Sequence, residues 1–307
     1  MEKRFLGKSN IEVSRLGLGC MSLGTDEQQA KEMIITAFEH GITYFDTADL
    51  YDYGVNEAIV GKTLAPIRDQ VVIATKVGNR FKEGEEGWSW DPSKKHIKTA
   101  VKQSLQRLKT DYIDLYQLHG GTIEDPIDET IEAFEELKSD GLIKEYGISS
   151  IRPNVIKEYL SKSSIVSVMM QYSLLDRRPE QTMELLAKNK VSAMIRGPIA
   201  KGILTKRGLT QLEQSHECNP YLSYSSSEVS EFLQNVKSIL LSDSRKMNEI
   251  ALQFVLANEA TTTIVAGASS SKQIIDNINS VNAKPLTDEE LSLLQQLSKT
   301  ENYTEHL

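Results

Sequence analysis

Two hydrophobic patterns alternate along this chain. Short runs of β-branched and apolar residues are each followed by a longer segment whose apolar positions recur at helical spacing. The runs with strand character are residues 16–20, 43–46, 71–75, 113–118, 145–148, 166–170, 191–195 and 263–266. The helical segments are residues 27–40, 56–65, 93–108, 127–140, 153–161, 179–189, 228–257 and 271–280.

This succession of strand–helix units favours a parallel sheet that closes on itself, the (β/α)8 TIM barrel of the α/β class. An open doubly wound sheet is the alternative. Residues 4–13 predict an N-terminal β-hairpin with its turn at residues 7–10, which would plug the bottom of the barrel, and residues 287–298 predict a last helix outside it. Because no low-complexity linker or charge block divides the chain, residues 1–307 are predicted to form a single domain.

The bulk composition narrows the class of protein. A formal net charge of −8 argues against a broad surface for nucleic acid or anionic lipid, although it leaves room for a local phosphate site. Residues 1–7 lack the apolar core of a signal peptide, and no apolar run approaches the length of a membrane span. With two cysteines, a cytoplasmic protein with reduced thiols is expected.

In a barrel of this kind, the chemistry lies on the loops that follow the carboxyl ends of the strands. Asp46, Lys76 and His119 fall at or directly after the ends of three of the predicted strands, and Tyr51 follows Asp46 by five residues. A phenol with a pKa near ~10 is a poor acid at neutral pH. A neighbouring ammonium favours the phenolate, and a carboxylate can hold that ammonium in place. Together these four residues predict a site that gives a proton to a carbonyl oxygen.

Other motif matches are explained better by chance. Residues 17–22 begin like a dinucleotide fingerprint, but the third glycine is replaced by Ser22. Gly61-Lys62-Thr63 resembles the end of a phosphate-binding loop, yet it lies within a helical pattern and lacks the earlier glycine. The remaining histidines have no metal-ligand spacing with either cysteine, so no metal site is predicted.

Several motifs, in order along the chain, resemble the aldo-keto reductase family. They are residues 45–61, with Phe45-Asp46-Thr47-Ala48 and Tyr51; residues 105–119, ending at His119; residues 141–149; and residues 264–277. The resemblance covers essentially the whole chain and is to bacterial reductases of the general-stress-protein and potassium-channel β-subunit branch. It implies a (β/α)8 barrel that binds a nicotinamide cofactor, usually NADP(H), across the strand carboxyl ends.

The resemblance also assigns roles to the four residues. Tyr51 would be the general acid that protonates the carbonyl oxygen during hydride transfer, and Lys76, paired with Asp46, would favour its phenolate form. His119 would orient and polarise the carbonyl. The substrate class implied is a small-molecule aldehyde or ketone, including reactive dicarbonyls.

Cofactor-binding positions follow from the same resemblance. Ser149 and Gln171 match the positions that bind the carboxamide, and the segment after residue 195 matches the stretch that passes the pyrophosphate. The full set of cofactor-binding residues expected is Gly19, Cys20, Met21, Ser149, Gln171, Arg196, Gly197, Pro198, Ile199, Gly202, Leu204, Gly267, Ser269, Lys272, Gln273 and Asn277.

The chain departs from the family pattern at three cofactor positions. Ser150 stands where the family often has asparagine, and Arg196 stands where many members stack an aromatic ring on the nicotinamide. A guanidinium can stack on a flat ring, but its charge disfavours the oxidised cofactor. In residues 268–271 no arginine is present to grip a 2′-phosphate, which leaves Lys272 and a helix N-terminus. NADP(H) is still favoured over NAD(H).

Two other functions remain open. The barrel would serve as a slow NADP(H)-binding redox sensor or regulatory subunit if it bound the cofactor and signalled to a partner. It would be a Schiff-base lyase if Lys76 attacked a carbonyl, although such chemistry needs neither Tyr51 nor the pair of Ser149 and Gln171. A monomer is the default for this architecture.

Two loops have alternative interpretations. Trp88 and Trp90, in a glycine-containing loop after the third strand, would either pack on the base of that loop or wall a substrate site. Residues 205–227 predict either a flexible flap over the cofactor or a surface excursion.

Overall fold

The computed structural model describes residues 1–82, 86–215, 218–241 and 245–306. Its centre is a closed barrel in which the strands lie in the order β10-β11-β12-β3-β4-β5-β8-β9, and all neighbours are parallel. The strands are β3 (Leu16–Gly19), β4 (Tyr44–Asp46), β5 (Val72–Val77), β8 (Ile113–Leu118), β9 (Ile143–Ser149), β10 (Ser167–Gln171), β11 (Ser192–Arg196) and β12 (Thr261–Gly267). The predicted (β/α)8 barrel and its eight strands are confirmed.

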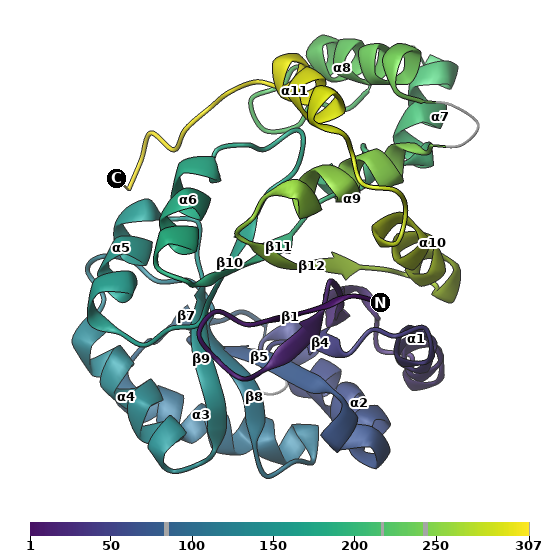
Figure 1. The fold of residues 1–307 in the computed structure, drawn as a ribbon. Helices are drawn as coiled ribbons and strands as arrows, with labels where there is room; N and C mark the ends of the chain where they lie inside the picture. The colour runs from purple at the N-terminus through teal and green to yellow at the C-terminus, as the bar shows by residue number, and fades with distance from the viewer. Residues whose placement is uncertain (83–85, 216–217, 242–244, 307) are drawn as a thin grey trace.

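Helices cover the outside of the barrel (Figure 1). Asp26 and Ser93 cap the first and third helices by accepting hydrogen bonds from backbone N–H groups in the first turn. The helices that alternate with the strands are α1 (Glu27–Glu39), α2 (Val55–Leu64), α3 (Lys94–Leu108), α4 (Ile127–Ser139), α5 (Pro153–Lys162), α6 (Glu180–Lys188) and α10 (Ser271–Val281).

The predicted N-terminal hairpin is present and lies across one end of the barrel (Figure 1), with β1 (Lys3–Phe5) antiparallel to β2 (Glu12–Ser14). Leu6 and Val13 are fully buried and pack with Tyr44 and Leu115, which belong to the barrel strands. Gly7, in the turn, has a positive φ of 52°, and a Cβ there would lie 2.4 Å from the carbonyl oxygen of Val166. Glycine therefore allows the hairpin to approach the barrel closely enough to plug it.

The region between β11 and β12 differs from the prediction. The single helix expected at residues 228–257 is wrong, because the structure has α8 (Ser226–Ile239) and α9 (Met247–Ala257) there, and residues 242–244 lie outside the described residues. In the sequence, the polar stretch around Arg245 and Lys246 separates the apolar positions of α8 from those of α9, which the prediction had joined into one helix. The segment 205–227 also contains a helix, α7 (Lys206–Ser215), which the sequence analysis missed. The last helix, α11 (Asp288–Leu297), packs against α8, outside the barrel as predicted.

Among the described residues, the loops of the barrel contain two short strands and several 3-10 turns. A short antiparallel pair, β6 (Asn79–Arg80) with β7 (Ser89–Trp90), follows β5, and 3-10 turns lie at η1 (Cys20–Ser22), η2 (Tyr51–Gly54), η3 (Ala65–Gln70) and η4 (Ala200–Gly202). Gly61 is inside α2, where a Cβ would lie 2.3 Å from the Cα of Leu108 in α3. Gly61-Lys62-Thr63 is therefore a point of helix–helix packing and not a phosphate loop.

Candidate active site

Strand alternation explains how the charged residues reach the barrel interior. Side chains two apart on a strand share a face, so Asp46 and Lys76 point inward one layer above Tyr44 and Ala74, which belong to the inner apolar cluster. Asp46 is 3% exposed and Lys76 is 1% exposed. The ends of β4 and β5 thus place a carboxylate and an ammonium side by side at the carboxyl end of the barrel.

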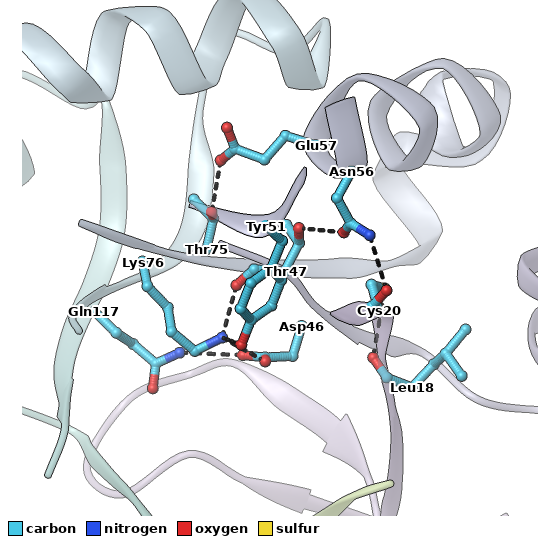
Figure 2. Close-up of polar contacts among 10 residues, drawn as sticks. All are labelled: Leu18, Cys20, Asp46, Thr47, Tyr51, Asn56, Glu57, Thr75, Lys76 and Gln117. Carbon is cyan, nitrogen blue, oxygen red and sulfur yellow. Dashed lines mark hydrogen bonds and ion pairs between the residues drawn. The ribbon is translucent and has the colours of Figure 1, made fainter. Parts of the chain in front are cut away.

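Lys76 is held by three hydrogen bonds (Figure 2). Its Nζ donates to Asp46 Oδ2 at 2.6 Å, to the carbonyl oxygen of Thr47 at 2.7 Å and to the hydroxyl oxygen of Tyr51 at 3.3 Å. Gln117 Nε2 donates to the other carboxylate oxygen of Asp46 at 3.3 Å, so the carboxylate is fixed from two sides. Three of the four residues predicted from the sequence therefore form one hydrogen-bonded chain.

The ammonium form of Lys76 is retained in spite of its burial. Burial by itself lowers the pKa of Lys76, but the Asp46 carboxylate and the Tyr51 oxygen oppose this, and the net shift of the pKa is upward. A charged ammonium that donates to the phenol oxygen leaves the hydroxyl hydrogen of Tyr51 free to be donated elsewhere. This is the geometry that a proton donor needs.

His119 completes the group from the end of β8. Its ring lies edge-on to Tyr51, with ring centroids 5.9 Å apart and an interplanar angle of 83°. Burial, together with the positive charges of Lys76 and Arg196, lowers the pKa of His119 to about 3. His119 is therefore neutral at neutral pH, and its Nδ1 has no hydrogen-bond partner among the described residues. A neutral imidazole next to the phenol can donate an N–H to a carbonyl oxygen.

A network from α2 holds β4 and β5, and no role was predicted from the sequence for its two α2 members, Asn56 and Glu57. Asn56 Nδ2 donates to the carbonyl oxygen of Cys20, while Asn56 Oδ1 accepts from Thr47 Oγ1 at 2.7 Å (Figure 2). Glu57 accepts from Thr75 Oγ1 at 2.6 Å, next to Lys76 in β5. The start of α2 thus fixes the backbone on either side of the ion pair.

The carboxamide position predicted for Gln171 already has several side-chain partners. Gln171 Nε2 donates to Asp176 Oδ2 at 2.9 Å and to the hydroxyl of Tyr221 at 3.1 Å. Its Oε1 accepts from Arg196 Nη1 at 3.0 Å, so the exposed Arg196 lies against the same amide. Gly197 follows with a φ of 67°, and a Cβ there would lie 3.3 Å from Gln171. Ser149, at the end of β9, pairs in register with Met169 of β10, the strand that carries Gln171.

The segment 205–227 and the C-terminal tail are both anchored near this amide. The hydroxyl of Tyr221 accepts the hydrogen bond from Gln171, and Tyr224 is buried. In the tail, Lys299 N donates to the hydroxyl of Tyr224 at 2.6 Å, and the Tyr303 ring lies 5.1 Å from the guanidinium carbon of Arg178. Tyr221 and Tyr224 are therefore held by packing and hydrogen bonds, while residues 216–217 of this segment lie outside the described residues.

The two tryptophans have different environments. Trp90 Nε1 donates to Asp125 Oδ1 at 2.9 Å, and its ring packs over Gly78 and Gly120, so this residue follows the packing interpretation. Trp88 is 58% exposed. Trp88 alone is therefore available as a wall of a substrate site.

A cavity of about 720 Å³ lies beside β12 and the N-terminus of α10. Seven of the predicted cofactor-binding residues line it: Ile199, Gly202, Gly267, Ser269, Lys272, Gln273 and Asn277. Gly267 faces Ser22, and a Cβ at Gly267 would lie 2.8 Å from Ser22 Oγ, so the glycine keeps the floor of the cavity open.

Five cations line this cavity, of which only Lys272 was predicted from the sequence. The others are Lys201, Lys206, Arg207 and Lys246. They come from η4, from the missed helix α7 and from the start of α9, which the prediction had merged with α8. The adjacent pair Lys206-Arg207 after Gly202 was a signal in the sequence. Glu249 and Asp276 also line the cavity, so the cations outnumber the acidic residues, and the lining has more positive charge than the departure in residues 268–271 implied.

The other predicted cofactor residues lie outside the lining of this cavity. Cys20 and Leu204 are fully buried core side chains, and burial raises the pKa of the Cys20 thiol well above its ordinary value. Pro198 is buried in the loop after β11, and Gly19 pairs with Gly267 across the closing strands. Met21 is exposed.

No helix within the described residues is long and apolar enough to cross a membrane. In the same part of the chain, no group of three or more histidine, cysteine or acidic residues is placed to hold a metal ion.

The model of the aldo/keto reductase family matches residues 15–299. The chain belongs to the aldo-keto reductase family, whose members are oxidoreductases that bind a nicotinamide cofactor. The uncharacterized oxidoreductase YqkF of Bacillus subtilis is 54% identical over 306 residues, which cover 100% of this chain and 99% of that protein. The resemblance seen in the sequence is confirmed.

Three further comparisons bear on conformation and cofactor. The solved holo form of the aldo-keto reductase AKR11C1 from Bacillus halodurans has a TM-score of 0.94 and 55% identity, covering 100% of this chain and 99% of that one. The apo form of the same enzyme has a TM-score of 0.85. The NADH-specific methylglyoxal reductase of Escherichia coli is 29% identical over 324 residues, covering 97% of this chain and 99% of that enzyme.

Proposed function

We propose that this protein reduces aldehydes or ketones to alcohols with NADP(H), and that Tyr51 is the general acid. The observation that carries the proposal is the chain of contacts from Asp46 through Lys76 to the Tyr51 hydroxyl, with bond lengths of 2.6 and 3.3 Å. A phenol that accepts from a buried ammonium, beside a neutral imidazole, is suited to give a proton to an oxygen.

Each residue has a distinct part in the reaction. A carbonyl oxygen bound between Tyr51 and His119 accepts hydrogen bonds from the phenol O–H and from the imidazole N–H. As negative charge builds on that oxygen, the proton of Tyr51 moves to it, and Lys76 stabilises the phenolate that remains. Asp46 keeps Lys76 in place and balances its charge. A reduced nicotinamide, when bound, would supply the hydride for the carbonyl carbon.

The residues around the large cavity fit the cofactor. A dinucleotide carries phosphates, and the cavity beside the N-terminus of α10 brings together Lys201, Arg207, Lys246 and Lys272. The closer similarity of this fold to the holo form of AKR11C1 than to its apo form, with TM-scores of 0.94 and 0.85, agrees with a site shaped for a cofactor.

The cluster of cations favours NADP(H) over NAD(H). NADP(H) has an additional 2′-phosphate, and a charge-assisted bond from an ammonium or guanidinium stabilises it. The NADH-specific methylglyoxal reductase shows that a related protein can prefer the other cofactor. NAD(H) is therefore the alternative that a binding experiment has to exclude.

The site opposes one of the two alternative functions, the Schiff-base lyase, but is compatible with the other, the redox sensor. A lyase needs the unprotonated amine of Lys76 as a nucleophile. The upward shift of the Lys76 pKa and its three hydrogen bonds oppose that form. A slow redox sensor would keep every contact described above, and a low rate of turnover would distinguish it. The single domain, the cytoplasmic location and the monomeric state stay predictions.

Titration of the protein with NADPH and, separately, with NADH tests the proposal, with tryptophan fluorescence as the readout. Tight NADPH binding with much weaker NADH binding, followed by steady consumption of NADPH with an aldehyde, is the expected result. Binding without turnover would instead indicate the sensor. Failure to bind either nucleotide would contradict both.

A further inference from the structure

A second cavity, of about 420 Å³, lies between α2 and α3. Its lining includes Asp49, Tyr53, Phe81, His96 and Gln103, and it does not include Tyr51, Lys76 or His119. The reductase function assigned above makes no use of it.

Asp49 forms a polar wall of this cavity. It is 2% exposed, and its Oδ1 has no hydrogen-bond partner among the described residues. Burial, reinforced by the negative charge of Glu57 and opposed by Arg107 and Lys76, raises the pKa of Asp49 to about 8. A buried acceptor without a partner is costly, so a ligand that donates to it is stabilised.

The balance of charge selects a cation. Arg107 also lines the cavity, but its guanidinium contacts Glu57 at 2.6 Å, and the two charges offset each other. Of the three charged residues Asp49, Glu57 and Arg107, Asp49 is left without an ion-pair partner. In its ionised form Asp49 would repel an anion, and Arg107 could bind one only by giving up Glu57.

The remaining lining matches an ammonium with a short apolar tail. Ala58 and Ala100 form an apolar wall. The rings of Tyr53 and Phe81 lie edge-to-face, with their centroids 5.7 Å apart. Aromatic faces attract cations. The Nε2 of His96 is also buried without a partner among the described residues, and burial lowers the pKa of His96, which favours a neutral ring whose Nε2 accepts a hydrogen bond in one of its two tautomers. A metal ion fits less well, because no cluster of three ligating side chains occurs in the described residues.

We propose that this cavity binds a small primary alkylammonium ion, whose N–H groups donate to Asp49 and whose carbon chain packs between α2 and α3. The site lies close to the catalytic residues, because the backbone N–H of Asp49 donates to the carbonyl oxygen of Lys76 at 3.3 Å. Binding to a protonated Asp49 transfers its proton to the solvent and leaves a carboxylate–ammonium pair.

Isothermal titration of the purified chain with n-butylammonium chloride tests this site without relying on reductase activity. The proposal predicts saturable one-to-one binding that weakens by about tenfold or more in Asp49→Asn, because a charge-assisted bond is lost. Asp69→Asn, a change at an exposed residue of η3, should bind as the wild type does. Tetramethylammonium, which has no N–H group, should bind much more weakly.

A second measurement keeps the test independent of how Asp49→Asn folds. Titrations of the wild type in two buffers of different ionisation enthalpy should show proton release at neutral pH, and less release above the raised pKa of Asp49. Absence of saturable binding to the wild type, equal binding by a folded Asp49→Asn, equal binding of tetramethylammonium, or no proton release would each overturn the proposal.

Discussion

The Nζ of Lys76 lies 3.3 Å from the hydroxyl oxygen of Tyr51 and 5.0 Å from the centre of its ring. Lys76 therefore contacts the phenol through the oxygen, on which charge develops when the proton leaves. Since the other two hydrogen bonds of Nζ go to Asp46 and Thr47, the ammonium has little freedom to move away.

Lys76→Met should abolish carbonyl reduction and also destabilise the fold. Removing the ammonium leaves the buried carboxylate of Asp46 unpaired, which costs about 3–5 kcal/mol in comparable buried pairs. Chemical denaturation measures this loss. The double variant with Asp46→Asn should recover much of the stability but none of the activity. Recovery of activity would show that Lys76 acts only as a structural counter-ion.

The pH profile should carry no signature of His119 near its ordinary pKa. Because the pKa of His119 is lowered to about 3, the imidazole stays neutral throughout the range from about pH 5 to pH 8. The profile of kcat/KM for the free enzyme should therefore show no inflection close to pH ~6.5. An inflection there that disappears in His119→Gln would contradict the neutral imidazole.

The lowered pKa of His119 should also make the stability of the fold depend on pH. In the unfolded chain the pKa of His119 is about 6.5. Below that pH the unfolded chain binds a proton at His119, and the folded protein does not. Stability should therefore fall as the pH drops from about 6.5 towards 3, and His119→Gln should reduce this dependence. Thermal unfolding at several pH values measures the slope. A slope that is equal in both proteins would refute the lowered pKa.

Substitutions at Glu57 should separate its two contacts. Glu57→Gln keeps an acceptor for Thr75 but loses the ion pair with Arg107, so stability should fall by about 1–3 kcal/mol while kcat changes little. Glu57→Ala loses both contacts, and kcat should fall as well because β5 carries Lys76. Equal kcat values for the two variants would show that the hydrogen bond to Thr75 does not position Lys76.

Cofactor preference should depend on Lys246. Lys246→Ala should weaken NADPH binding by about tenfold while leaving NADH binding nearly unchanged, if this ammonium meets the 2′-phosphate. Ser269→Arg should raise the preference for NADPH by the same logic. Lys284→Ala, at an exposed lysine outside the cavity lining, is the control. An unchanged ratio of the two affinities in Lys246→Ala would place the phosphate elsewhere.

The barrel was predictable because its signal is local and repeated. Each strand is a short β-branched run, and strand alternation then decides which residues point inward, so Asp46 and Lys76 could be expected to meet. The helix boundaries around residues 205–257 were not predictable in the same way. Apolar positions on both sides of Arg245 share a helical spacing, so the break between α8 and α9 was missed.

The lining of the cavity proposed for the cofactor was predicted in part. Residues close in sequence to the ends of β11 and β12, such as Gly202 and Ser269, were found from motif positions. Lys246 was not, because it reaches the cavity from the start of α9, a helix boundary that the periodicity concealed. Asn56 was also missed, since its two contacts to Thr47 and Cys20 depend on how α2 packs rather than on spacing.

The most direct test of the proposed reduction is a single-turnover experiment on the NADPH-saturated protein. Oxidation of the bound cofactor is followed after mixing with an aldehyde, in the wild type, in Tyr51→Phe and in the matched control Tyr53→Phe. We predict rapid oxidation in the wild type and the control, and a rate at least about 10²–10⁴-fold lower in Tyr51→Phe, with NADPH affinity within a few-fold. Near-normal oxidation in Tyr51→Phe would contradict the assignment of Tyr51 as the proton donor.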